Sequence, residues 1–251
     1  MRRSAILFLV IAAAAAFLFV RLGFWQLGRL QERKTRNAVV AVRLDSAMVG
    51  PELLPADTGL LRYRRVAVSG VYDHANEVIL AGRTRQGSPG VNFYTPLRIP
   101  GRDTAILVNR GWVYSPDATD VDAARWREPA RAEVRGFALP FPAPGRGDPV
   151  IHGRERTLRH PELAAMRELI PYPIAGYYLV QTDTTDFDID STPARLAPPA
   201  LDEGPHLSYA LQWFSFAAIA LGGAGVMAWN GRKGKERGGS TSDPLPGSIP
   251  R

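Results

Sequence analysis

Two uncharged stretches decide the architecture of this chain: SAILFLVIAAAAAFLFV at residues 4–20 and LSYALQWFSFAAIALGGAGVMAWN at residues 207–230. Each approaches the ~20 apolar residues that an α-helix needs to cross ~30 Å of hydrocarbon. Because backbone polar groups inside hydrocarbon must be satisfied within the segment, both stretches are predicted to be helices. We therefore expect transmembrane helices over residues 4–27 and 206–230, and a disordered tail over residues 231–251.

The residues between the helices, 30–205, are predicted to form a mainly antiparallel β domain. Apolar side chains alternate around Gly70 in residues 65–72, and turn-forming residues follow at 87–90 and 100–103. Short strands joined by tight turns favour an antiparallel meander. Two candidate short helices cover residues 118–127 and 161–169. The expected fold class is a membrane protein of α+β type, in which two transmembrane helices flank an extracytoplasmic β domain with one or two short helices.

The net charge of +7 lies beside the helices and not on the domain. Residues 30–205 hold 22 Lys and Arg against 22 Asp and Glu. A nucleic-acid-binding domain would carry a basic face, so nucleic acid is not an expected partner. The excess includes Arg2 and Arg3 before the first helix and four basic residues within 232–237 after the second. Short basic flanks stay in the cytoplasm, so both termini are predicted to be cytoplasmic and the domain extracytoplasmic.

The first apolar stretch also resembles a secretory signal, with its basic start and the small residues Ala12 to Ala16. The apolar run continues through residues 17–20 and 24–27 without a convincing small-x-small cleavage site, so we expect a retained anchor. The membrane segment begins almost at Met1, which leaves no room for a mitochondrial transit peptide and favours a bacterial inner membrane.

Signatures of catalysis and of a resident metal are scarce. The sequence has no Cys and only four His and four Met, so it offers neither a disulfide framework nor a thiolate metal site. The His-Glu-x-x-His, Gly-x-Ser-x-Gly and phosphate-loop motifs are absent from the sequence, which argues against a membrane-tethered hydrolase. We expect a protein that is not an enzyme.

The start of the second helix carries the candidate site. Four residues fall near one helical face because residues three, four and seven apart stack. They are His206, Tyr209, Trp213 and Phe216. One titratable imidazole thus stands above an aromatic wall. The alternative interpretation is an aromatic belt at the membrane interface, with His206 among the lipid headgroups.

Small residues at 12–16 and at 218–225 predict that the two helices pack closely. Antiparallel packing would bring residues of the first helix level with His206 and Tyr209 at the outer interface. These residues are Arg21, Trp25 and Gln26. The sequence therefore predicts a ligand cleft between the helices.

Three segments, in order along the chain, resemble the Surfeit locus protein 1 family. They are LGFWQL at residues 22–27, LVNRGWV at residues 107–113 and the stretch from Gly204 to Ala217. The resemblance implies a non-enzymatic assembly factor for haem-copper cytochrome c oxidase. Such a factor would hold haem a transiently and help to place it in the catalytic subunit.

By motif, His206 matches the family histidine associated with haem and is the implied ligand of the haem iron. Tyr209, Trp213, Phe216 and Trp25 would then line the apolar slot, and Arg21 or Arg29 would meet a propionate. The implied partners are the oxidase catalytic subunit and the lipid bilayer, with the enzymes of haem a synthesis as further candidates. A haem-free scaffold that clamps oxidase subunits is the alternative. Arg110 and Trp112 fit partner recognition, and Trp112 fits the core at least as well.

Overall fold

The computed structural model describes residues 3–182 and 192–238, with side chains described as far as residue 232. The chain divides into two compact units. The helical unit comprises Met1–Ala38 and Asp202–Arg251, and the β domain comprises Val39–Leu201. The expected fold class is confirmed: two long apolar helices flank a mainly β domain with short helices.

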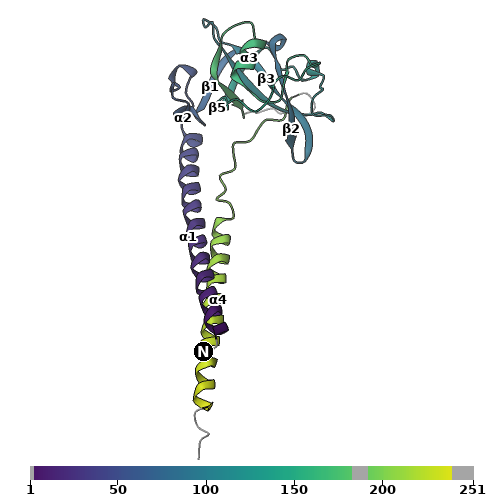
Figure 1. Cartoon of the computed structure of the whole chain (residues 1–251). Coiled ribbons are helices and arrows are strands. Elements are labelled where there is room, and N and C mark those ends of the chain that lie inside the picture. The colour runs from purple at the N-terminus through teal and green to yellow at the C-terminus, as the bar shows by residue number, and fades with distance from the viewer. Residues whose placement is uncertain (1–2, 183–191, 239–251) are drawn as a thin grey trace, which may run out of the picture. The chain divides into compact units, whose positions relative to one another are not determined.

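The two long helices are α1, Arg3–Asp45, and α4, His206–Gly238 (Figure 1). Both are long and apolar enough to cross a membrane. Helix α1 continues well beyond residue 27, because residues 28–45 lack proline and are rich in good helix formers. Helix α4 continues past the expected end at Asn230. The remainder of the expected tail, residues 239–251, lies outside the described residues.

The β domain is built from seven strands and several short helical segments. The strands are β1 (Arg65–Tyr72), β2 (Val78–Arg85), β3 (Ser88–Arg98), β4 (Ala105–Tyr114), β5 (Arg131–Pro140), β6 (Thr157–Leu158) and β7 (Ile174–Gln181). The helical segments are η1 (Pro51–Leu53), α2 (Thr58–Leu61), η2 (His74–Asn76), η3 (Ala123–Trp126) and α3 (Leu163–Leu169).

Five of the strands close into a barrel. The sheet order is β1-β5-β7-β4-β3-β2-β6, and β1 also pairs with β3, which joins the two sides. Strand β3 can serve both neighbours because its first residues pair with β2 and its last two, Leu97 and Arg98, with β1. Most pairings are antiparallel, as expected, but β4 pairs parallel with β7 and β2 parallel with β6. A simple meander therefore describes only β2, β3 and β4.

Two local predictions need correction. The turn between β2 and β3 lies at Gln86 and Gly87, whose φ angles of 50° and 82° suit a tight hairpin, while residues 88–90 already belong to β3. The helix expected at residues 118–127 is only the 3-10 turn η3. The helix expected at 161–169 is present as α3.

Apolar side chains from all five barrel strands fill the interior. The cluster comprises Leu61, Val66, Val68, Tyr72, Leu97, Ile106, Val108, Val134, Ala138 and Leu179. A second cluster joins the outer face of the wall to α3 and β6, which contribute Met166 and Leu158. A third, small cluster of Val91, Phe93 and Val113 packs beside η3.

Candidate functional site

The predicted site lies on the helical unit, where α1 and α4 pack through small residues. Five small residues are buried at this contact: Ala12, Ala16, Gly23, Ala210 and Ala217. A Cβ at Gly23 would lie 2.5 Å from the ring of Phe214, so only glycine allows this approach. Small residues permit close backbone contact between membrane helices. The expected packing through residues 12–16 is therefore observed.

The packing predicted for residues 218–225 of α4 is wrong. A Cβ added at Gly222, Gly223 or Gly225 would meet no atom within 4 Å, and Ala218 is exposed. Residues that face α1 repeat at intervals of three and four from His206, and 222, 223 and 225 fall outside that repeat. The small residues of α4 that do the packing are Ala210 and Ala217.

His206 begins α4 and makes a direct contact with α1. Its Nδ1 lies 2.9 Å from Oε1 of Gln26, and the imidazole is half-buried. An amide oxygen accepts, so Nδ1 donates, and a neutral ring then keeps the lone pair on Nε2. Gly204 has no side chain, and a Cβ added to it would lie 3.5 Å from Nε2. His206 thus presents one basic nitrogen beside a glycine.

Aromatic rings occupy the next two turns of α4. The ring of Trp213 stacks on Phe19 with centroids 5.7 Å apart, and Phe216 contacts both rings at 5.8 and 5.9 Å. Phe24 meets Phe214 edge-on at 5.4 Å. The structure therefore brings Trp213 and Phe216 together with Phe19, a ring that the sequence interpretation did not single out.

The remaining predicted residues lie further from this contact. Tyr209 is 46% exposed and Trp25 is 57% exposed. Arg21 is also exposed, and it precedes Gln26 by five residues, about 7.5 Å along the helix at 1.5 Å per residue. Arg21 is therefore level with the aromatic turns and not with His206. Of the first-helix residues expected beside His206, Gln26 is the one in contact.

Polar contacts continue the helix pairing beyond the apolar residues. The Asp202 carbonyl accepts from Asn37 at 2.8 Å and from Arg33 at 3.1 Å, and Lys34 lies 3.4 Å from Glu203. These groups are largely exposed, and exposed ion pairs contribute little stability each. They contribute to the register in which His206 meets Gln26.

The β domain holds a buried charged cluster centred on Arg110, a residue whose role the sequence did not decide. Arg110 is fully buried at a β-bulge, since Phe93 pairs with Gly111 and the next pair already involves Asn109. Its guanidinium donates to Glu77 at 2.6 Å, to Glu128 at 2.8 Å and to Thr95 at 2.7 Å. Side chains alternate along a strand, so Arg110 shares the inward face of Ile106 and Val108. Arg110 is therefore a structural core residue.

Arg195 completes this charged cluster. It pairs with Glu128 and donates to the backbone carbonyl of Arg110. Sequence reasoning did not find Glu77, Glu128 and Arg195, because they are far apart in the chain and no spacing marks them. The one available signal was Arg110 itself, an arginine in the middle of an apolar strand, which requires buried acceptors.

The charged cluster lowers the pKa values of its two carboxylates. Burial alone would raise the pKa of Glu77, but His74 nearby, the charge of Arg110 and a hydrogen bond from Thr95 outweigh it and lower the pKa. Burial would likewise raise the pKa of Glu128, whose pairs with Arg195 and Arg110 lower it instead. Both carboxylates are therefore held ionised.

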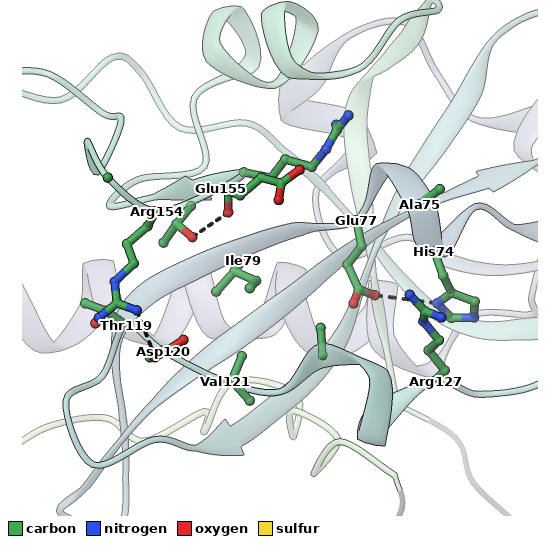
Figure 2. Close-up of a pocket in the computed structure, with 14 residues that line it drawn as sticks. His74, Ala75, Glu77, Ile79, Thr119, Asp120, Val121, Arg127, Arg154 and Glu155 are labelled. Carbon is green, nitrogen blue, oxygen red and sulfur yellow. Dashed lines mark hydrogen bonds and ion pairs between the residues drawn. The ribbon is translucent and has the colours of Figure 1, made fainter.

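A pocket of about 470 Å³ lies over one side of this cluster (Figure 2). His74 and Glu77 form one wall, and Arg154 and Asp120, joined at 2.8 Å, form the opposite one. These wall charges largely compensate one another. Within the parts of the chain whose side chains are described, no three His, Asp or Glu residues gather as a metal site.

Comparison with known proteins matches this architecture over most of its length. The model of the SURF1 family matches residues 13–218. The chain is 26% identical to a SURF1-like protein of Monosiga brevicollis, covering 89% of this chain and 87% of the relative. It is 27% identical to an uncharacterized SURF1-like protein of Mycobacterium bovis, covering 94% and 87%. A match of 33% identity to Surfeit locus protein 1 of Mus musculus covers 42% of this chain and 38% of that protein.

Two apolar helices that pack on each other and flank a five-stranded barrel define a β-domain protein with two candidate membrane helices. Because the family model spans most of both units, the chain belongs to the SURF1 family. The family is known for assembly factors of cytochrome oxidase and not for enzymes.

Proposed function

We propose that this protein is an assembly factor that holds haem a transiently and aids its insertion into the catalytic subunit of cytochrome c oxidase, with His206 as the iron ligand. Family membership supports the oxidase context. The contact between His206 Nδ1 and Gln26 Oε1 is the observation that carries the haem proposal.

Metal-ligating histidines usually donate their second ring nitrogen to an oxygen, which fixes the tautomer and the ring orientation. Gln26 supplies such an oxygen to His206, so Nε2 is the nitrogen available to iron. A neutral amide partner makes the imidazole a weaker donor than a carboxylate would. Moderate donor strength suits a carrier that must release its cargo.

The donor set fits haem, which takes a proximal histidine and an apolar slot. Trp213, Phe216 and Phe19 supply aromatic surface two turns along α4 from His206, and Tyr209 and Trp25 offer exposed rings nearer to it. Arg21 is the cation proposed for a propionate. When bound, haem would offer its iron for coordination by His206, and the other residues would hold and orient the ring.

The proposed location is a bacterial inner membrane, with both termini in the cytoplasm and the β domain outside it. The basic residues Arg2, Arg3 and Arg232 support this topology, because short positively charged flanks stay inside. The catalytic subunit is the proposed partner, and the enzymes of haem a synthesis are candidate donors of the cargo.

An absorption spectrum of the detergent-purified protein, expressed with haem a available, tests the proposal. The wild-type protein should show a haem spectrum, and His206→Ala should lose at least about tenfold in occupancy, the scale expected for loss of a ligand or its support. Gln26→Leu should weaken binding less than His206→Ala does. His152→Ala, which removes an imidazole whose side chain is 83% exposed, is the matched control.

A haem spectrum retained by His206→Ala would overturn the ligand role. A colourless wild-type protein that still promotes oxidase maturation would instead favour the haem-free scaffold, in which the helices and the β domain clamp oxidase subunits.

A further inference from the structure

A second pocket of the β domain, of about 510 Å³, has cationic walls. Asn92 and Trp112 are register partners on β3 and β4, so their side chains share one face of the sheet. Arg83 and Arg85 on β2, together with Arg195, add three guanidinium groups. This volume lies within the ~300–1,000 Å³ typical of small-molecule sites.

The positive charge of this pocket is only partly compensated. Among the described residues, its lining includes no Asp or Glu. Arg83 donates to the backbone carbonyls of Ala81 and Arg159, which are neutral, and Arg85 has no ion pair within residues 3–182 and 192–232. Of the three arginines in the lining, Arg195 is the one that pairs with a carboxylate, Glu128, which it shares with Arg110. Within the described part of the chain, an anion entering the pocket would therefore meet two cations, Arg83 and Arg85, that have no ion pair.

Buried polar atoms without partners concentrate in the same wall. In the described part of the chain four such side-chain atoms occur, and three belong to this lining: Asn92 Oδ1, Trp112 Nε1 and Arg195 Nε. Asn92 and the Arg195 side chain are each only 7% exposed. An unmade buried hydrogen bond costs ~1–3 kcal/mol, so native proteins rarely leave several together.

We propose that this pocket binds a small organic anion with a carboxylate or phosphate group and an apolar body. Arg83 and Arg85 attract the charged group, and the N–H groups of Trp112 and Arg195 donate to it. A donor on the ligand meets Asn92 Oδ1. The Trp112 indole and Leu196 supply the apolar wall. The three polar atoms are sealed from water, so binding includes side-chain rotations that open them.

This proposal rests on the β domain alone and is independent of haem binding. The test measures the unfolding temperature of the full detergent-purified chain against inorganic phosphate and, separately, succinate. Potassium chloride at equal ionic strength is the reference. A saturable rise with at least one probe is expected, and the responding probe tells phosphate from carboxylate. No saturable rise with either probe would overturn the proposal.

Two variants locate the response. Arg85→Gln and Trp112→Phe should each weaken the apparent affinity for the responding probe about tenfold, as for one lost charge-assisted hydrogen bond. Arg146→Gln, an exposed arginine in a loop outside the pocket lining, should respond like the wild type. An unchanged affinity in either pocket variant would overturn the assignment.

Trp112→Phe also separates binding from a purely structural role. Its indole N–H has no partner in the free protein, so without anion the variant should unfold at the same temperature as the wild type or higher. A lower unfolding temperature without anion, combined with unchanged anion affinity, would show that Trp112 only supports the fold.

Discussion

The helical unit and the β domain each place a polar side chain in an apolar setting, but they support it differently. His206 is half-buried and has one neutral partner, Gln26. Arg110 is fully buried and has two carboxylates, a hydroxyl and a backbone carbonyl as acceptors. A buried charge needs many fixed partners, because an unpaired one is too costly. A group proposed to take up and release a ligand keeps few partners, and its geometry can change.

Removing Arg110 should have the largest effect of the changes considered. Arg110→Leu leaves Glu77 and Glu128 buried without their shared cation, and breaking a buried pair in this way costs ~3–5 kcal/mol. Chemical denaturation of the full chain, followed by near-ultraviolet circular dichroism, measures the loss. Arg135→Leu is the control, because the Arg135–Glu133 pair is about half exposed and should cost under ~1 kcal/mol. Equal losses in the two variants would contradict the comparison.

A bulky side chain at the contact between α1 and α4 should have the second-largest effect. Gly23→Leu forces a side chain into Phe214, and overpacking of this kind costs ~1–3 kcal/mol. The chain has no cysteine, so cysteines introduced in place of Gln26 and His206 can form, within one chain, only a disulfide between α1 and α4. After proteolysis of the β domain, the fraction of helix pairs that stay linked, the disulfide yield, measures the contact. Gly23→Leu should lower the yield strongly. Gly222→Leu should leave it unchanged, since no atom lies within 4 Å of its Cβ position.

Acid should weaken the β domain through the charged cluster. The pKa values of Glu77 and Glu128 are lowered by folding, so the stability they contribute is present above their ordinary value of 4.5 and is lost as pH falls through the lower folded values. The unfolding free energy should therefore be level from pH 7 to about 5.5 and fall below that. Glu77→Gln should show a shallower fall, and an identical slope would exclude Glu77 as a source.

The smallest effect is expected at the exposed contacts with Asp202. Arg33→Ala removes a solvent-exposed pair and should change stability by under ~1 kcal/mol. In Arg33→Ala, the disulfide yield between positions 26 and 206, measured at low salt, should fall only slightly. The fall should be smaller than the one expected in Gly23→Leu. A collapse of the yield in Arg33→Ala would mean that polar contacts, and not small apolar residues, hold the helices together.

Sequence patterns predicted the local elements well and the long-range contacts poorly. The uncharged runs predicted both helices, and alternation around Gly70 predicted β1. Closure of the barrel could not be predicted, because β7 inserts between β4 and β5, which precede it by many residues. The face of α4 was misjudged because three glycines suggested a contact surface, whereas helical periodicity from His206 selects Ala210 and Ala217.

For the candidate site, the sequence identified His206, Trp213 and Phe216 because they share a helical face. It also placed Gln26 level with His206, where the two side chains meet. It could not identify Phe19 as the ring that contacts both Trp213 and Phe216, because that contact depends on the register between two helices. That register is set partly by Asp202 and its partners on α1, which carry no recognisable motif.

The place of β7 in the sheet also has a consequence for biosynthesis. The barrel strand made last lies between two made earlier, and its partner β4 runs parallel to it. Until residue 181 has been synthesised, β4 and β5 each expose an unpaired edge. High contact order makes the final closure slow, and open strand edges invite aggregation. The domain should therefore depend on holding chaperones until its last strand is made. Truncation before β7 should yield an aggregating or degraded product instead of a smaller barrel.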